Sequence, residues 1–328
     1  MTTVVCFGEM LLRLSPPGFE RLLQSPTLCA HFGGSEANVA IGLARFGVQS
    51  RYVTRLPLTI VGDAAIRSLR AEGVNTDDVI RGGQRLGLYF VENGAGQRPS
   101  VVTYDRSPSS FSTIDPADLD WPVVLNSASW LHVTGITPAL GPGPATCVRA
   151  AVAAARTAGI TVSFDLNYRA ALWPVHEAAP VLQEIARGAD LLIAGEDHLQ
   201  PLLGIAPGAD AGQRVAETYG PGLVAITSRE SRSATENTVG AVLWDQQARL
   251  LHVTPQYTVH IVDRIGAGDA FVAGLIYGLT SDRLVADTLR FAVAAGVLNH
   301  TIPGDACLLT VADVDRLANG DASGRLQR

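Results

Sequence analysis

Residues 262–271, V-D-R-I-G-A-G-D-A-F, combine residue types that bind an anion with one that can accept a proton. Gly266 and Gly268 let the backbone curl so that several N–H groups point at one spot, and the amphipathic helix that follows adds a partial positive charge there. Asp269 falls in the first turn of that helix, where the helix dipole favours the ionised carboxylate. A carboxylate beside a bound phosphate suits general-base chemistry in phosphoryl transfer. The alternative is that Asp269 is only a helix N-cap after a glycine turn.

A second glycine pair precedes another expected helix, in residues 31–40, H-F-G-G-S-E-A-N-V-A. Gly33 and Gly34 would allow a ligand to approach the backbone closely, and Asn38 could form hydrogen bonds with hydroxyl groups. The alternative is an ordinary helix after a turn, with Ser35 as its cap.

Three side chains could recognise an acidic ligand. Tyr104 and Arg106 are two residues apart on an expected strand, so they project from one face, where a guanidinium can bind a carboxylate with two hydrogen bonds. Arg169 follows an expected strand and would lie at the carboxyl end of the sheet, where α/β proteins bind ligands. In a chain of net charge -6, two converging arginines would imply an acidic substrate. The alternative for each arginine is a solvated surface position.

The composition excludes several kinds of chemistry. All 25 Lys and Arg residues are arginine, so neither a Walker-type P-loop nor a Schiff-base lysine is available. The acidic balance, without a basic run, argues against nucleic-acid or membrane partners, and the N-terminus has no signal-peptide pattern. The cysteines are isolated, without metal-ligand spacing, which is typical of a reducing compartment. We therefore expect a cytoplasmic protein that acts on small molecules.

Short apolar runs alternate with alanine-rich helical stretches, which predicts βαβ units around a mostly parallel sheet. Strands are expected at 3–7, 160–166, 190–194 and 223–227, with an antiparallel pair at 241–244 and 249–253. Helices are expected at 35–46, 63–72, 145–158, 269–279 and 284–299. A hairpin of 86–92 and 100–106, joined by N-G-A-G-Q, breaks this rhythm. We expect one domain over 1–328, with lid strands at about 11–32 and 84–107 and a loose polar tail at 319–328.

The two glycine motifs carry a family resemblance. They read G-G-S-E-A-N-V-A-I-G-L-A-R-F-G and D-R-I-G-A-G-D-A-F-V-A-G, and they resemble the signatures of the ribokinase-like (PfkB) carbohydrate kinases. Three more segments resemble the 2-keto-3-deoxygluconate kinases within that family: R-L-G-L-Y-F-V-E-N-G-A-G-Q-R-P-S-V-V-T-Y-D-R, H-V-T-G-I-T-P-A-L and F-D-L-N-Y-R-A-A-L-W-P. The resemblance implies a three-layer αβα fold with a small β-sheet lid, and transfer of the ATP γ-phosphate to the 6-hydroxyl of 2-keto-3-deoxygluconate.

The resemblance also implies roles for individual residues. Asp269 would be the catalytic base, and the anion hole for the γ-phosphate would be formed by Gly266, Ala267 and Gly268. Contacts with the sugar acid are implied for Gly34, Asn38, Tyr89, Tyr104, Arg106 and Arg169, and Gly33 is expected to belong to the same substrate-binding site. Asn167 would lie near the nucleotide phosphates, with Thr227 and Arg229 on the same side, and Asp263 would shape the loop or a cation site. Mg²⁺ is expected with ATP, because the metal neutralises phosphate oxygens.

The nucleotide side departs from the family pattern. In place of an N-x-x-E motif the chain has Gly195, Glu196, Asp197 and His198, which leaves Glu196 or Asp197 as candidate metal ligands. Where many relatives carry K-x-G-x-x-G, residues 227–240 offer Arg229 and Arg232 for phosphate. Val293 replaces an asparagine, which leaves the base specificity open.

Two other functions fit the same residues. One is a kinase for a neutral sugar or nucleoside, in which the arginines serve the lid or an oligomer contact. The other is a non-catalytic sensor of sugar acids on the same fold. A homo-oligomer is expected in each case, because lid strands with exposed edges in this family pair between subunits.

Overall fold

The computed structural model describes residues 2–324. Its large sheet has nine strands: β1 (Thr3–Phe7), β4 (Gln49–Val53), β9 (Trp130–Thr134), β10 (Thr161–Asp165), β11 (Leu191–Gly195), β12 (Leu223–Ser233), β13 (Glu236–Asp245), β14 (Leu250–Val253) and β15 (Tyr257–His260). Their order is β14-β13-β12-β11-β10-β9-β1-β4, and β15 pairs with β13. Neighbours from β4 to β12 run parallel, whereas β13 runs antiparallel to its neighbours. The predicted mostly parallel sheet is confirmed.

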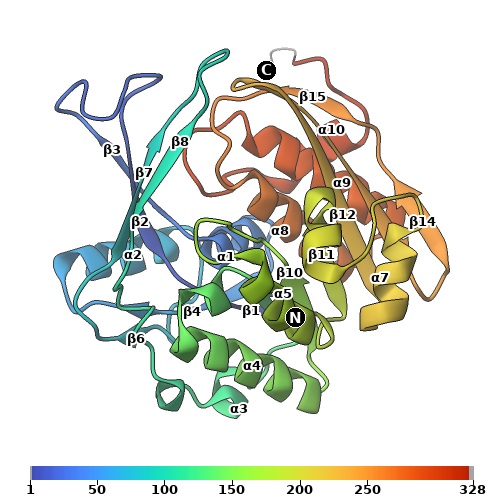
Figure 1. Ribbon diagram of the computed structural model, residues 1–328, viewed down its shortest axis with the longest axis horizontal. Coiled ribbons are helices and arrows are strands. Elements are labelled where there is room, and N and C mark those ends of the chain that lie inside the picture. Colours follow the sequence, from blue (N-terminus) through green and yellow to red (C-terminus); the bar gives the residue numbers. More distant parts are fainter. Residues whose placement is uncertain (1, 325–328) are drawn as a thin grey trace.

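Helices cover both faces of this sheet (Figure 1). One layer contains α1 (Ser35–Arg45), α2 (Ile60–Ala71), α8 (Ala267–Thr280), α9 (Val285–Asn299) and α10 (Val311–Ala318). The other contains α3 (Trp121–Val124), α4 (Pro142–Thr157), α5 (Val175–Ala186) and α7 (Ala211–Tyr219). Alternate side chains of β1 enter the two cores, because successive residues of a strand point to opposite faces.

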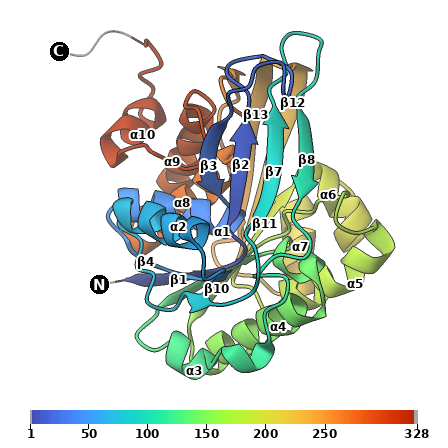
Figure 2. The same cartoon turned by 90° about the vertical axis from the view of Figure 1, so that its left-hand side faces the viewer.

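A second sheet of four strands stands apart from the first and consists of β3 (Cys29–Gly33), β2 (Leu11–Ser15), β7 (Gly87–Glu92) and β8 (Val101–Asp105). The predicted hairpin of β7 and β8 is confirmed as an antiparallel pair, and β2 joins β7 in parallel. Figure 2 shows these strands side by side, upright in front of β12 and β13. The fold therefore places a small sheet over one end of the large one.

The remaining elements are short. They are β5 (Arg55–Leu56) paired with β6 (Ile80–Arg81), the single turn α6 (Glu196–His198), and the turns η1 (Pro116–Asp118), η2 (Thr137–Leu140) and η3 (Leu199–Leu203). Within residues 2–324, no helix has the length and apolar character needed to cross a membrane.

Several predicted bounds were wrong by a few residues. Helix α2 begins at Ile60 rather than 63, because the Thr59 side chain caps it by accepting the Gly62 N–H. Helix α4 begins with Pro142, since proline is favoured in the first turn, where its missing N–H costs nothing. Strand β12 continues past 227 to Ser233, and α10 was not predicted. Of the predicted tail, residues 325–328 lie outside the described residues, and 319–324 form neither helix nor strand.

Candidate active site

The first turns of α1 and α8 meet the carboxyl ends of the parallel strands at one place, which is where α/β folds bind ligands. Glu36 of α1 accepts hydrogen bonds from the backbone and hydroxyl of Thr134, at the end of β9. Asn167, just after β10, donates from Nδ2 to the Ser35 hydroxyl at 2.7 Å. Ser35 in turn donates to Asp269 of α8. Hydrogen bonds thus link the ends of β9 and β10 to the first turn of α1, and α1 in turn bonds the Asp269 carboxylate of α8.

Asp269 is 9 % exposed and both of its oxygens accept hydrogen bonds from α1. Its Oδ1 lies 2.6 Å from Ser35 Oγ, and its Oδ2 lies 2.7 Å from Asn38 Nδ2. Ser35 is not the helix cap that its type predicts, because Gly34 occupies the N-cap position. The Ser35 hydroxyl is thus turned toward Asp269, and this contact was not foreseen.

Burial raises the pKa of Asp269, and this effect exceeds the opposing hydrogen bonds from Ser35 and Asn38 and the charge of Arg169. The helix dipole, which favours the ionised carboxylate, therefore acts against the effect of burial. Burial likewise raises the pKa of Glu36 and of Asp165 to about 7 each, and the charge of Asp269 adds to both shifts. A proton-accepting group with a raised pKa is typical of a general base.

The loop before α8 has the shape of an anion site. Gly266 is the N-cap at φ +79°, and the first intrahelical bond runs from the Ala270 N–H to the Gly266 oxygen at 2.8 Å. The amides of Ala267 and Gly268 precede that bond, so they have no partner within the helix. A β carbon on Gly268 would meet only open space, whereas one on Gly266 would overlap the Asp305 backbone oxygen. The loop is backed by protein on one side and open on the other.

The glycine pair before α1 packs closely against other segments of the chain. A β carbon on Gly34 would overlap the backbone oxygen of Glu9, and one on Gly33 would overlap the carboxylate of Asp305. Glycine is thus required at both positions by the packing of the chain itself, and contact of these glycines with a ligand stays a prediction. Asn38, by contrast, lies at the site through its bond to Asp269.

The small sheet brings Tyr89, Tyr104 and Arg106 together. The two tyrosine rings stack with centroids 5.9 Å apart, and the Arg106 guanidinium lies 5.3 Å from the Tyr104 ring centre. The Arg106 Nε donates to Glu9 Oε2 at 2.9 Å, and the hydroxyl of Tyr89 donates to Asp305. Both polar groups therefore have protein partners, which the spacing of the sequence did not indicate. The carboxylate clamp stays a prediction.

The region that the family resemblance assigns to the nucleotide is rich in arginine. Burial, followed by the charge of Arg169, lowers the pKa of His198, and Arg229 contributes to the same shift. Burial and then Arg229 also lower the pKa of Arg264, a residue that the motif contains but that sequence reasoning left without a role. Thr227 lies in β12, where its hydroxyl donates to the Ala194 oxygen at 3.5 Å. These arginines form a positive region suited to phosphate without any lysine.

No metal-ligating cluster is evident among residues 2–324, since no three His, Cys, Asp or Glu side chains gather in a suitable group. Glu196 and Asp197 are exposed on α6 after β11. Mg²⁺ characteristically binds through one or two carboxylates together with substrate phosphates and water. The residues present therefore fit a magnesium ion that arrives with a nucleotide.

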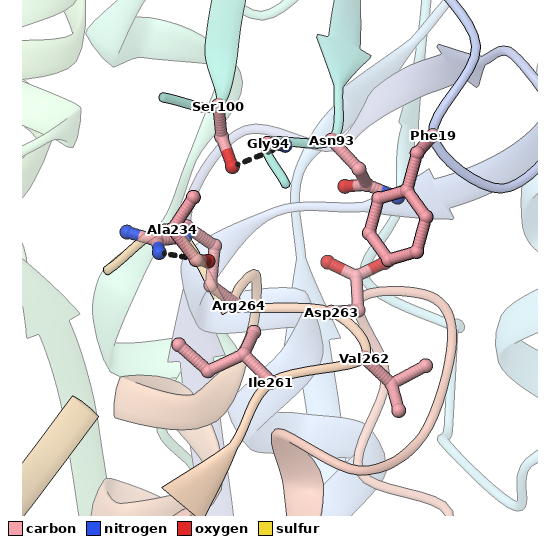
Figure 3. A pocket seen from close by; sticks show the side chains of 9 residues that line it. All are labelled: Phe19, Asn93, Gly94, Ser100, Ala234, Ile261, Val262, Asp263 and Arg264. Carbon is pink, nitrogen blue, oxygen red and sulfur yellow. Dashed lines mark hydrogen bonds between the residues drawn. The ribbon is translucent and has the colours of Figure 1, made fainter. Parts of the chain in front are cut away.

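The tip of the small sheet touches the β12–β13 turn. The Ala234 N–H donates to the Gly96 oxygen at 2.8 Å, across the two turns. Figure 3 shows a small pocket beneath this contact, with Asn93 and Ser100 on one side and Asp263 and Arg264 on the other. The small sheet thus reaches across to the segment that leads into the anion loop.

Taken together, the layered fold and a buried carboxylate beside open helix amides define a ribokinase-like sugar kinase, a phosphotransferase without a P-loop lysine. Residues 1–309 match the pfkB family of carbohydrate kinases, and the chain belongs to this family. It is 30% identical over 324 residues to a 2-dehydro-3-deoxygalactonokinase of Haloferax volcanii, covering 98% of each chain. A crystal structure of the Thermotoga maritima 2-dehydro-3-deoxygluconokinase is 43% identical, with TM-score 0.94 over 98% of this chain and 100% of that one. A Vibrio cholerae fructokinase with bound fructose, ADP and calcium is 25% identical, with TM-score 0.77 over 96% and 98%.

Proposed function

We propose that this kinase transfers the γ-phosphate of ATP to the primary 6-hydroxyl of a 2-keto-3-deoxy sugar acid, 2-keto-3-deoxygluconate. The observation that carries the proposal is the buried Asp269, held by Ser35 and Asn38 within the same helix turn as the open amides. The names of the Haloferax and Thermotoga proteins, which act on 2-dehydro-3-deoxy sugar acids, support this substrate class. Arg106 and Arg169 supply the positive charge that an acid requires.

In this proposal Asp269 accepts the proton of the 6-hydroxyl as that oxygen forms a bond to the γ-phosphorus and the bond to ADP breaks. The Ala267 and Gly268 amides donate to the oxygens of the transferred group, where negative charge is concentrated. The small sheet, anchored at its tip to the β12–β13 turn, limits the access of water that would otherwise hydrolyse ATP.

The nucleotide is assigned to the arginine-rich side. Arg229 and Arg264 would bind its phosphates, with Asn167 and Thr227 nearby. Bound ADP and calcium in the Vibrio fructokinase support a nucleotide and a divalent cation for this fold. Mg²⁺, held by the nucleotide and the candidates Glu196 or Asp197, would neutralise phosphate charge. A cytoplasmic homo-oligomer stays a prediction.

A panel of acceptors tests the proposal. ADP release is measured with 2-keto-3-deoxygluconate, 2-keto-3-deoxygalactonate, fructose, ribose and adenosine, each with Mg²⁺ and ATP. We expect the highest kcat/KM with the first acid. Preference for fructose would favour the neutral-sugar alternative, and binding of the acid without ADP release would favour a sensor. Either result would refute the proposal.

Replacing Arg106 with alanine is expected to raise KM for the sugar acid by about 10- to 100-fold, because a hydrogen bond to a charged group contributes about 1.5–3 kcal/mol. KM for ATP should change little. Arg85, two residues before β7, forms an exposed ion pair with Asp105 and provides a matched control, Arg85→Ala. If Arg106→Ala raises KM for the sugar acid and KM for ATP equally, Arg106 does not belong to the acid-binding site. The same conclusion follows if Arg85→Ala raises KM for the sugar acid as much as Arg106→Ala does.

Replacing Ser35 with alanine is expected to move the acidic limb of the kcat/KM profile to higher pH. The Ser35 hydrogen bond lowers the pKa of Asp269 by favouring the ionised form, so its loss lets burial raise that pKa further. The activity lost should be regained at alkaline pH. A profile that keeps its acidic limb in place while falling equally at all pH values would show that Asp269 does not set that limb.

A further inference from the structure

Arg13, on strand β2 of the small sheet, is 1 % exposed, although a buried arginine is costly unless its donors are satisfied. Its Nη2 donates to Asp263 Oδ2 at 2.7 Å, and its Nη1 donates to Asp305 Oδ1 at 2.8 Å. Its Nε donates to the Ser15 hydroxyl at 2.8 Å. All three nitrogens of the guanidinium are therefore engaged, and one cation lies between two buried carboxylates.

These two carboxylates belong to the segments that shape the anion loop. Asp263 Oδ1 accepts the Ile265 N–H at 3.1 Å, and its Oδ2 accepts the Gly304 N–H at 3.1 Å. The backbone oxygen of Asp305 lies against Gly266, where it would overlap any β carbon. A shift of either carboxylate would therefore displace the backbone that presents the open amides.

The same cluster reaches the small sheet through a second side chain. The Tyr89 hydroxyl of β7 donates to Asp305, and Tyr89 faces Arg13 across the β2–β7 ladder. Arg13 of β2 and Tyr89 of β7 thus both contact carboxylates that support the anion loop. Figure 3 shows that Asp263 also lines a pocket together with Asn93 and Ser100 of the β7–β8 turn.

We propose that Arg13 is a positioning residue for phosphoryl transfer, which ties the small sheet to the anion loop and so sets where the Ala267 and Gly268 amides meet the transferred phosphate. Arginine suits this role because a planar guanidinium can bond two carboxylates and a hydroxyl at once, whereas a lysine ammonium lacks this fork. The inference rests on the proposed role of the anion loop, and it does not depend on which sugar is phosphorylated.

The test measures kcat and KM, with the best acceptor, for Arg13→Lys and Arg13→Ala. We expect kcat of Arg13→Lys to fall by about 10- to 100-fold, since a misplacement of about 1 Å can cost this much. KM for the sugar should stay close to that of the wild type. Guanidinium chloride, at concentrations far below those that unfold the protein, should raise kcat of Arg13→Ala in a saturable manner. It should leave kcat of Asp269→Asn unchanged.

The matched control is Arg283→Ala. Arg283 pairs with Asp315 at 2.6 Å and lies 4.6 Å from the Phe291 ring centre, beyond the far end of α8. Its loss should lower the unfolding temperature and leave kcat unchanged.

The proposal is overturned if Arg13→Lys keeps the wild-type kcat, or if Arg13→Ala loses activity only in proportion to its unfolded fraction and guanidinium restores none. If Arg13→Ala does not fold, Arg13→Lys decides alone. Full turnover by Asp269→Asn would instead refute the proposed base and leave the guanidinium comparison valid.

Discussion

Replacing Asp269 with asparagine is expected to lower kcat by about 10²- to 10⁴-fold, the range over which general-base catalysis contributes. KM for the sugar should change little, because asparagine keeps the shape of the side chain beside Ser35 and Asn38. Initial rates of ADP release at saturating ATP and sugar measure this effect. A variant with wild-type kcat would show that the proton leaves by another route.

The unfolding temperature separates this loss from a folding defect. Burial raises the pKa of Asp269 in the folded chain above its unfolded value. Such a group contributes stability that is present below the unfolded pKa and is lost as the pH rises through the folded pKa. At pH 7 the ionised carboxylate is therefore a cost that Asp269→Asn removes, whereas the amide nitrogen of asparagine cannot accept one of the two hydrogen bonds from Ser35 and Asn38. These effects oppose each other, so the unfolding temperature should stay close to that of the wild type. A marked drop would assign the lost activity to damaged structure.

Replacing Gly266 with alanine is expected to lower kcat by about 100-fold or more, since the amides beyond it would shift from their place. The residue has φ +79°, and its β carbon would overlap the Asp305 backbone oxygen, so the loop must move. Gly268→Ala should behave differently, because its β carbon meets only open space. We expect Gly268→Ala to keep the wild-type unfolding temperature and to raise KM for ATP, as the methyl group enters the proposed phosphate space.

Gly159→Ala controls for backbone strain alone. Gly159 has φ +69° with open space around its β carbon, and it lies before β10, at the opposite end of that strand from the site. This variant should lose stability without losing kcat. If Gly159→Ala and Gly266→Ala reduce kcat equally, or if Gly268→Ala leaves both kinetic constants unchanged, the anion loop is wrongly assigned.

Much of the fold could be predicted from local pattern. Strand β1 has the predicted bounds, 3–7, because its apolar run is short and both faces are buried. The helices expected at 35–46 and 63–72 end within one residue of the predicted positions, and each is followed by a glycine, Gly47 and Gly73, at φ +85° and +84°. Helix α10 was missed, although the capping box of Thr310 and Asp313 is a signal that could have revealed it.

The errors arose where pairing with another segment decides the outcome. The polar run after residue 227 resembles a loop, yet it forms β12 because its backbone pairs with β13. Ser35 has the side chain of an N-cap, but its hydroxyl donates to Asp269, a residue of another helix. The partner of Ser35 lies 234 residues away, outside the window that a local pattern can describe, whereas β12 and β13 form a hairpin that the polar composition of the run conceals.

The class of chemistry follows from features that are local in the sequence. An anion loop without lysine, a carboxylate in the next helix turn and alternating strands and helices are local features, and each depends on residues only a few positions apart. Only the tertiary structure decided the environment of those groups. In L-L-R-L-S, Arg13 stands between two leucines, a pattern that predicts an exposed charged side chain on a strand. In the structure Arg13 is a buried cation, because Asp263 and Asp305, far along the chain, lie beside it. Burial and pairing depend on the whole folded chain, and for that reason the raised pKa of Asp269 and the support of its loop could not be derived from sequence spacing.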